Sequence, residues 1–470
     1  MVRRRSVPSA SLVVLSLLLS LLLSACKVGP NYTRPQLNPP PQYRFAADQT
    51  EATSLANAPW WQIFDDPALQ ALIREAIANN LDLRAAVARV EFARAQAGIA
   101  KSYFYPQVDA TVDYPIRQTV GGSEGTGDVS NGGVYGFRLA WELDLFGRIR
   151  REHEAAVARV LASEQGRRGV LVTLVGDVAT TYFLLRQLDL QLEISLRTLA
   201  SNDQTVDYFQ TRLDGGVSNR LEVDRIRANR EVTAAKIPDL EKQIAIAEDA
   251  LSVLLARPPG PITRAALPID TAAPPAIPPG VPASLLERRP DVVQAEELLV
   301  AANADIGAAK ALFFPDISLT GFLGGISGQV LSLLSSSTGG VWSVTPSLVQ
   351  QVFNAGRLTN NLAATRATYE ETLALYQKAA LNGYREVADS LVTITKLAQI
   401  RVSQQTGVDQ LQDAAMLARD RYTSGLASYL DVLNADQQLF DQQLQLAQTL
   451  GSEFSARAEL YRALGGGWQP

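Results

Sequence analysis

The stretch AKSYFYPQVDAT, residues 100–111, returns in altered form as AKALFFPDISLT at residues 309–320. In both copies a helix-like run reaches aromatic residues and a proline, after which apolar and polar residues alternate as in a strand. Pro106 and Pro315 mark the same point of the two copies and lie 209 residues apart. The same spacing recurs in two glycine pairs, Gly147 with Gly356 and Gly216 with Gly425. Three matches at one offset indicate a tandem duplication.

The composition argues against catalysis. The 470 residues include one Cys, one His and two Met, which excludes a disulfide framework and a cluster of His and Cys metal ligands. A Ser-His-Asp triad would have to use His153, which lies in the charged run RREHEAA and is better explained as a solvated helix residue. A phosphate-cradling GxxxxGK loop is also absent from the sequence. We therefore expect no enzyme, no catalytic residue, no metal site and no cofactor other than a covalent lipid.

Residues 1–25 have the features of a signal peptide. Three arginines, Arg3 to Arg5, precede an apolar run at residues 11–23 that is too short to cross a bilayer. The run ends in LSAC, which is typical of a lipobox, the bacterial signal for cleavage before Cys26 and its acylation, for example with palmitate. The alternative is an ordinary signal peptide with a chance cysteine. Cleavage leaves 40 basic and 48 acidic residues, a net charge of −8 that disfavours nucleic acid as a partner.

The sequence divides the mature chain into two copies and their connections. The predicted segments are a lipid-anchored extended segment at residues 26–58, repeat 1 at 59–256, a proline-rich linker at 257–283, repeat 2 at 284–464 and a tail at 465–470. Each repeat is expected to contain helices, then two strands, then a long helical hairpin. The first helix is expected to begin at a cap formed by Asp65 or Asp66, followed by Pro67.

Two strands are expected in each repeat, four in all. Their predicted positions are about 105–116 and 133–146 in repeat 1, and about 314–325 and 340–353 in repeat 2, with the glycine-rich stretch before residue 133 as a loop. In the first strand Val108, Ala110 and Val112 alternate with acidic and polar residues. Such a pattern suits a soluble sandwich with one wet face or a membrane barrel with a polar lumen. The aromatic residues at the strand starts form either an interfacial girdle or part of a core.

Very long helices follow the strands. Between about Arg148 and Arg212, and again between about Arg357 and Tyr422, proline is absent. About 65 residues of helix correspond to a length on the order of 100 Å, which suggests coiled-coil packing. The hairpin tips are expected near residues 214–218 and 423–428, with Ser218 and Ser428 as candidate caps of the returning helices. Pro238 is expected to kink or break the first returning helix, whereas the second should run to about Ala463.

Four strands are too few to form a closed barrel. A sheet in lipid must leave no unpaired edge, and the smallest bacterial barrels have about eight strands. If the strands cross a membrane, several chains must share one barrel, and three chains supply twelve strands. The helices then project together as a tube on the side of the anchored Cys26, in the periplasm.

The chain resembles the TolC-like outer membrane factors of tripartite efflux systems, in particular the NodT family of outer membrane lipoproteins. The resemblance rests on LLSACKVGPNY, FDDPALQALI, WELDLFGRI, LLERRPDVVQAEELLVAANADIGAAKALFFPDISL, FNAGRL, YTSGLASYLDVLNADQQL and LYRALGGGW, which occur in this order along the mature chain. It implies a homotrimer of mixed α/β membrane protomers, with a shared twelve-stranded barrel and a periplasmic α-helical barrel. It further implies an exit duct of a drug or antibiotic efflux pump in the outer membrane. The implied partners are a periplasmic adaptor protein and an inner-membrane efflux transporter, of the RND type.

The resemblance also implies a periplasmic gate near the hairpin tips. Tyr422 corresponds to a linking tyrosine and Asp431 to a ring carboxylate, and the duplication pairs Asp431 with Glu222. Asn434 stands where some relatives have a second aspartate, and its repeat partner is Arg225. Asp431 and Asn434 share one helix face, so three chains would crowd carboxylates around a narrow mouth. The alternative is that these are solvated residues at helix starts.

The two tips are the implied docking points for the adaptor. They comprise Gly215, Gly216, Val217 and Ser218 in repeat 1, and Gly425, Leu426, Ala427 and Ser428 in repeat 2. Ala427 departs from relatives that have a linking arginine there. Helix-turn geometry alone explains the glycines equally well.

Two other functions fit the same pattern. One is a periplasmic coiled-coil lipoprotein that acts as a scaffold with soluble sheets. The other is the outer-membrane component of type I protein secretion. The sequence does not select the exported substrate among drugs, metal ions, aromatic acids and peptides.

Overall fold

The computed structural model describes residues 27–37, 43, 61, 64, 66–113, 116–119, 128–131, 133–264, 288–327 and 339–466. The predicted signal peptide, the predicted acylation site Cys26 and most of the proline-rich linker therefore lie outside the described residues. The chain forms two compact units. The sheet unit contains residues 1–36, 89–164 and 294–376, and the hairpin unit contains residues 37–88, 165–293 and 377–470. Both repeats contribute to each unit.

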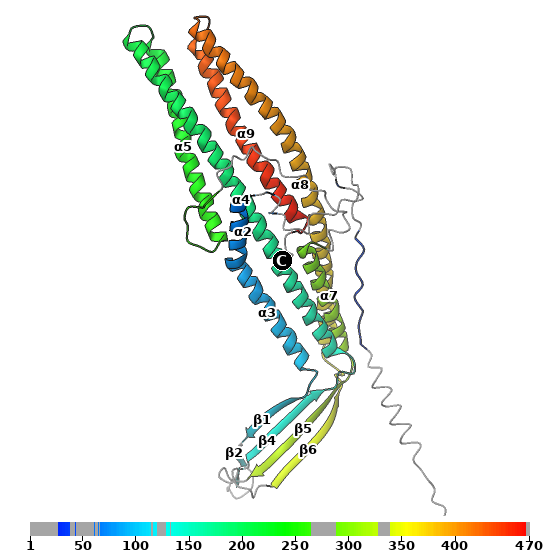
Figure 1. Ribbon diagram of the computed structural model, residues 1–470. Helices are drawn as coiled ribbons and strands as arrows, with labels where there is room; N and C mark the ends of the chain where they lie inside the picture. The colour runs from blue at the N-terminus through cyan, green and yellow to red at the C-terminus, as the bar shows by residue number, and fades with distance from the viewer. Residues whose placement is uncertain are drawn as a thin grey trace, which may run out of the picture. The chain divides into compact units, whose positions relative to one another are not determined.

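The elements of the two repeats correspond one to one over most of their length (Figure 1). Repeat 1 contains α2 Pro67–Asn79, α3 Leu81–Ser102, β1 Gln107–Asp113, β2 Ile116–Thr119, β3 Asp128–Asn131, β4 Gly133–Glu142, α4 Arg148–Asp214 and α5 Arg220–Leu254. Repeat 2 contains α7 Pro290–Ala311, β5 Asp316–Ser327, β6 Gly339–Val349, α8 Arg357–Thr423 and α9 Tyr429–Ala463. Helices α3, α4 and α5 begin and end 209 residues before α7, α8 and α9. The left-handed residues that follow the returning helices, Ala256 and Gly465, keep this offset too.

The four long strands form one antiparallel sheet in the order β1-β4-β5-β6. Phe137 of β4 pairs with Leu323 of β5, which in turn pairs with Trp342 of β6. Strands β4 and β6 end earlier than the sequence suggested, since residues 143–146 and 350–353 are not in the sheet, whereas β5 extends two residues further than predicted, to Ser327. The glycine-rich stretch expected to be a loop also contains β3, which pairs with β2. Backbone groups beyond β1 and β4 still require hydrogen-bond partners, and this second ladder supplies them.

Helix α2 begins where Asp66 satisfies its free backbone amides. One Asp66 carboxylate oxygen accepts hydrogen bonds from the amides of Ala68 and Leu69, at 2.9 and 3.2 Å. The other oxygen accepts a hydrogen bond of 2.6 Å from the Tyr182 hydroxyl on α4. Of the two candidate caps, the structure therefore uses Asp66, because its carboxylate also fixes α2 against α4.

The hairpin unit is built on two helix pairs, α4 with α5 and α8 with α9. Helices α4 and α8 contain 67 residues each, and α5 and α9 contain 35 each. Of the kink or break expected at Pro238, the break is wrong, because α5 continues through this residue. Beyond it, Leu240, Ile244 and Leu251 remain buried in the main core. Burial of this stripe offsets the roughly 3 kcal/mol that an interior proline costs.

The main core of the hairpin unit gathers apolar residues from α2, α4, α5, α8 and α9. Helix α4 also contains a window that is long and apolar enough to cross a membrane, but half of that window is buried inside the protein. Leu174, Val178 and Leu185 of α4 belong to the main core. The apolar character of α4 is therefore explained by packing. In the sheet unit, Ala155 and Ala158 of α4 pack against two alanines of α7, and such small side chains let helices approach closely.

In each repeat, a side chain donates a hydrogen bond to the last backbone carbonyl of the returning helix, and the two bonds are at equivalent positions. The Asn80 side-chain amide donates to the Leu254 carbonyl at the end of α5, at 2.9 Å. In repeat 2 the Arg289 guanidinium donates to the Ala463 carbonyl at the end of α9, at 2.7 Å. Donor and acceptor are both shifted by 209 residues, although the donor side chain differs. The duplication therefore preserved the contact and not the residue.

We predict that Asn80→Ala lowers the thermal unfolding midpoint, whereas Asn79→Ala does not. Asn80 is 4% exposed and also accepts a hydrogen bond of 2.9 Å from the Leu83 amide. Its loss leaves two buried backbone groups without partners, a cost of about 1–3 kcal/mol. Asn79 precedes it on the exposed side of α2 and serves as the matched control. Equal midpoints, measured by circular dichroism in detergent, would contradict the closing role of Asn80.

Candidate functional site

One face of the β-sheet is apolar and exposed. Val112 is 72% exposed, Leu323 64% and Trp342 74%. The register places further members of this face beside them: Val108, Phe137, Leu139, Trp141, Leu319, Val344 and Leu348. In a soluble sandwich this face would be covered by the protein itself. An apolar surface of this extent requires lipid or another protein against it.

The opposite face of the sheet is mainly polar, although Phe322 and Val341 also lie on it. Arg138 of β4 forms an ion pair of 2.5 Å with Asp113 of β1, and Asp109 lies directly opposite Arg138 in the register. On β5 and β6 the hydroxyls of Ser318 and Ser347 are hydrogen-bonded at 2.7 Å. The alternation expected from the sequence is confirmed on β1 and β4. One wall of this kind can face lipid on one side and water on the other.

The sheet has two open edges. Strand β1 pairs with β4 and strand β6 pairs with β5, and among the described strands neither has a second neighbour. Unpaired edge groups are a template for another strand, and in lipid they must be paired. The sheet of one chain is therefore incomplete as a membrane wall.

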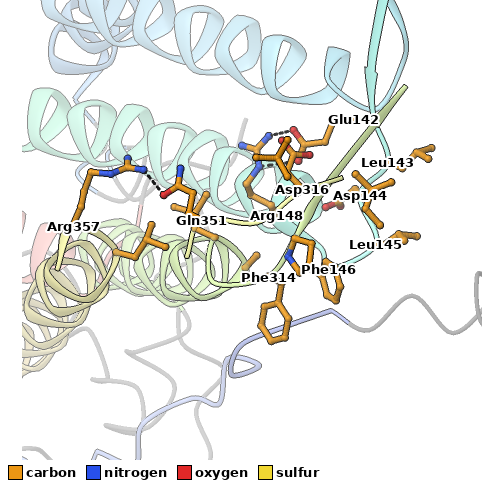
Figure 2. A pocket seen from close by; sticks show the side chains of 16 residues that line it. Glu142, Leu143, Asp144, Leu145, Phe146, Arg148, Phe314, Asp316, Gln351 and Arg357 are labelled. Atoms are coloured by element: carbon orange, nitrogen blue, oxygen red, sulfur yellow. Dashed lines mark hydrogen bonds and ion pairs between the residues drawn. The ribbon is translucent and has the colours of Figure 1, made fainter. Parts of the chain in front are cut away.

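A cavity of about 170 Å³ lies where the strands meet the helices of the sheet unit (Figure 2). Figure 2 shows Arg148 directed at Glu142, with an Nε–Oε1 distance of 2.9 Å, and Arg148 also bonds Glu152 at 2.7 Å. Phe146 stacks on Phe314 with ring centroids 4.8 Å apart. These paired charges and packed rings connect the strands to the helices of the sheet unit around this cavity.

The sequence-predicted junction residues lie at the boundaries of elements in the sheet unit. Pro106 and Pro315 each immediately precede a strand, β1 and β5. Gly147 and Gly356 each immediately precede a long helix and have φ angles of +79° and +82°. A side chain is strained at such φ values, so glycine is required where the chain turns from the sheet into α4 and α8.

Both hairpin tips of the hairpin unit end in the same turn. Gly216 and Gly425 each have a φ of +73°. The following residues, Val217 and Leu426, donate backbone hydrogen bonds of 2.8 Å to Arg212 and Arg421. This is the Schellman arrangement, in which a left-handed glycine ends a helix. Val217 and Leu426 are well exposed, so each tip carries an apolar side chain on its surface.

The acidic residues predicted for the gate form local hydrogen bonds at the helix starts, and one of them, Asp431, is part of a helix cap. The Asp431 carboxylate accepts hydrogen bonds of 3.1 Å from the Ser428 amide and hydroxyl, so Ser428 and Asp431 cap α9 together. In repeat 1 the expected cap Ser218 is wrong, because Asn219 caps α5 through a bond of 3.0 Å to the Glu222 amide. Ser218 instead donates to the Glu222 carboxylate at 2.7 Å.

The remaining predicted gate and tip residues lie beside these caps. Arg225 and Asn434 are exposed one turn further along α5 and α9. Gly215 begins the first turn, and Ala427 is half-buried before Ser428. The structure of one chain thus brings the predicted residues to two separate helix starts, and their action as a gate stays a prediction.

Tyr422 joins the two hairpins within one chain. Its ring lies 5.8 Å from Phe209 of α4 and 5.3 Å from Tyr429 of α9. Phe209 and Tyr429 approach more closely, to 4.2 Å. Burial raises the pKa of Tyr422, an effect that Arg212 opposes and Glu222 reinforces. Burial also raises the pKa of Tyr429 to about 12, so both tyrosines stay uncharged at neutral pH.

The sequence analysis missed two members of this aromatic cluster, Phe209 and Tyr429. Phe209 is 1% exposed and contacts the second hairpin, whereas its neighbour Tyr208 is half exposed. The sequence does place an aromatic residue near the end of each long helix and at the start of α9. Which of these aromatic residues contact one another across the two hairpins depends on the tertiary structure and cannot be predicted from a local pattern. Within the described residues, no group of His, Cys, Asp or Glu is arranged to hold a metal ion.

The comparisons with known proteins agree with this geometry. The family model described as outer membrane efflux protein matches twice, at residues 72–257 and 281–466, and the two matches are offset by 209 residues. SilC of Salmonella typhimurium, described as a probable outer membrane lipoprotein, is 33% identical over 97% of this chain and 99% of its own. SrpC of Pseudomonas putida, a solvent efflux pump outer membrane protein, is 36% identical over 95% of this chain and 97% of its own.

A solved structure of the outer-membrane channel OprN resembles the chain with a TM-score of 0.88. Its sequence is 32% identical, and the match covers 95% of this chain and all of that channel chain. The relatives are channel and efflux proteins and not enzymes.

We predict that Phe209→Ala loosens the contact between the hairpins, whereas Tyr208→Ala leaves it intact. Removing a buried phenylalanine costs about 3–5 kcal/mol, and this side chain packs on both Tyr422 and Tyr429. Hydrogen exchange should accelerate at residues 205–226 and 419–432 in the Phe209 variant. Unchanged exchange at residues 419–432 would show that the aromatic cluster does not join the hairpins.

Proposed function

The chain belongs to the outer membrane efflux protein family, and from this premise we propose that three copies assemble into one channel through the outer membrane. The protein is an outer-membrane exit duct of an efflux system. The proposal concerns how such a duct is completed, anchored and closed. It rests on one observation: a sheet with an apolar and a polar face ends in two open edges.

Edge pairing between chains supports a trimer. Strand β6 of one chain would pair with β1 of the next, so that each edge finds a partner and the ring closes. Two chains would give eight strands, and the interior of an eight-stranded barrel is filled by its own side chains. Twelve strands from three chains leave a lumen. The apolar face of the sheet would then meet lipid, and Asp109, Asp113 and Arg138 would line the water-filled interior.

The anchor and the hairpins are assigned to the inner side of this membrane. Acylation of Cys26 after cleavage of residues 1–25 would attach the chain to the periplasmic leaflet. The long helices of three chains would form an α-helical barrel in the periplasm. Their tips are the proposed docking points for a periplasmic adaptor protein, itself bound to an inner-membrane transporter. The exposed Val217 and Leu426 offer that adaptor an apolar contact on each tip.

We further propose that the tip carboxylates keep the periplasmic mouth closed at rest. Three copies of Glu222 and Asp431 would bring six carboxylates to the mouth, where they attract cations. The Asp431 carboxylate also caps α9, and the Glu222 carboxylate accepts a hydrogen bond from Ser218 just before α5. The proposed closure would therefore depend on side chains that also hold the two helix starts.

The trimer is tested with Cys26→Ser, which removes the acylation site. If the strands form a shared barrel, this variant should still require detergent for extraction and should still have the mass of a trimer in native mass spectrometry. The competing scaffold function, a periplasmic coiled-coil lipoprotein, requires the variant to be released as a soluble protein. Release without detergent would therefore overturn the proposed channel assembly.

The gate is tested with Glu222→Ala combined with Asp431→Ala. Asp431→Ala removes a cap of α9, which costs about 0.5–2 kcal/mol, and Glu222→Ala removes the hydrogen bond to Ser218 beside α5. Both losses should loosen the tips, raise single-channel conductance in planar bilayers and weaken cation preference. Asp224→Ala is the matched control, because Asp224 is an exposed acid at the same helix start whose ion pair with Arg220 caps no helix. Wild-type conductance and ion selectivity in the double variant would contradict the gate.

A further inference from the structure

Arg151 is a fully buried arginine that binds the segment directly after the predicted acylation site. We call residues 27–34 the strap. The Arg151 guanidinium donates to the strap carbonyls of Val28 and Gly29, at 3.1 and 3.2 Å, and to the Asn31 side chain at 3.1 Å. It also bonds Glu154 at 3.0 Å. The Arg151 side chain has no exposed surface. Three of its four hydrogen bonds are to residues of the strap.

Glycines let the strap lie directly on the helices of the sheet unit. A Cβ added to Gly29 would lie 2.5 Å from the Cα of Gly307 on α7, and a Cβ added to Gly307 would lie 2.7 Å from the Arg151 side chain. A Cβ on Gly147 would lie 3.1 Å from the Cα of Lys27. Strap, α7 and Arg151 are therefore stacked without room for a single methyl group. Such a fit is a built receptor site for one segment of chain.

Both ends of the strap are fixed as well. At its start, Lys27 forms an ion pair with Glu154, and the Val28 amide donates to the Phe146 carbonyl at 3.2 Å. Further on, the amide of the buried Asn303 donates to the Pro30 carbonyl at 3.0 Å. Tyr32 and Arg34 both donate to the Glu296 carboxylate, at 3.2 and 2.7 Å.

The energetics of Arg151 make the strap an obligatory part of the fold. A buried guanidinium without partners is strongly unfavourable, and breaking one side of a buried charged network is more costly than never forming it. If the strap left, Glu154 would be the one partner of Arg151 that remains from this network. The strap is thus bound by a site that is unstable when empty.

The bound strap also fixes where an acyl chain would begin. Cys26 directly precedes Lys27 in the sequence. Lys27 lies on Gly147, in the turn between the last residue of β4 and the first of α4. An acyl group on Cys26 would therefore enter the leaflet at the point where the strands leave it.

We propose that the Arg151 site is a receptor for the mature amino-terminal segment, and that it fixes the lipid anchor at the base of the transmembrane sheet. This inference rests on the proposed function, because the anchored group is the acyl chain on Cys26. Its partner is the lipid of the periplasmic leaflet. Arg151 acts as a positioning residue: it touches no exported substrate, but it makes anchor and strands enter the membrane at one place.

The strap is tested by trypsin cleavage after Lys27 in the full-length protein labelled with palmitate. Cleavage there releases the label with a two-residue lipopeptide and leaves a new amino terminus at Val28, which mass spectrometry identifies. Arg151→Met should accelerate this release by at least about tenfold, because loss of the guanidinium opens the strap locally. Arg159→Met is the matched control, since Arg159 is a half-exposed arginine two turns along α4 whose partner is Asp305. Equal release rates in the Arg151→Met and Arg159→Met variants would overturn the proposal.

Two further measurements separate the strap from general misfolding and from the channel assignment. If Arg151→Met fails to fold, Asn31→Ala tests the same hydrogen bond from the strap side and leaves Arg151 and Glu154 in place. This variant should also accelerate release of the label, and release at the wild-type rate would count against the receptor.

In Cys26→Ser protein, cleavage is followed by the appearance of the Val28 terminus alone. Arg151→Met should have the same effect there, because Arg151 and not the lipid holds the strap. If the wild-type protein carries no palmitate label, the lipid anchor is refuted. If the protein is labelled but Arg151→Met does not change the rate at which trypsin releases the label, the receptor is refuted.

Discussion

Unpaired backbone groups at the two edges of the sheet are the constraint on which the rest of this protein depends. In water, β1 and β6 would be tolerable edges, but in lipid each unpaired amide or carbonyl costs several kcal/mol. The apolar face excludes water as the environment of this sheet, since Trp342 and Val112 are mostly exposed on it. In the proposed trimer, strands of neighbouring chains satisfy both conditions by completing the wall. The proposed channel would then be a consequence of hydrogen bonding, and its pore would be the space that the completed wall encloses.

Much of this fold was predictable because duplication doubled each local signal. The prolines before β1 and β5, the glycines before α4 and α8, and the two faces of β1 all follow from spacing and alternation in the sequence. Local patterns failed where two adjacent residues compete for one role. Asp66 prevails over Asp65 because Tyr182, 116 residues away, bonds its carboxylate. Asn219 caps α5 while Ser218 turns to Glu222.

Other features were beyond sequence analysis for a different reason. Pro238 has a strong local preference to end a helix, yet the buried stripe that follows it holds α5 together. The aromatic cluster of Phe209, Tyr422 and Tyr429 brings together residues from two repeats, and single-residue patterns contain no information about that meeting. The positions of the tip carboxylates were predicted from the family resemblance, whereas their hydrogen bonds to Ser218 and Ser428 are visible only in the structure. The candidate gate residues are therefore also structural, and the proposed closure would depend on intact helix starts.

The twin turns at the tips have a geometric consequence for anything that binds them. Both turns share the same backbone, with a left-handed glycine and an apolar residue after it, but one presents valine beside an asparagine cap and the other leucine beside a serine cap. In the proposed assembly of three chains, the two kinds of tip would alternate around the rim. The six tips would have similar backbones, but their side chains would repeat only three times. Identical subunits of a partner that bind all six tips would therefore meet two chemically different binding sites.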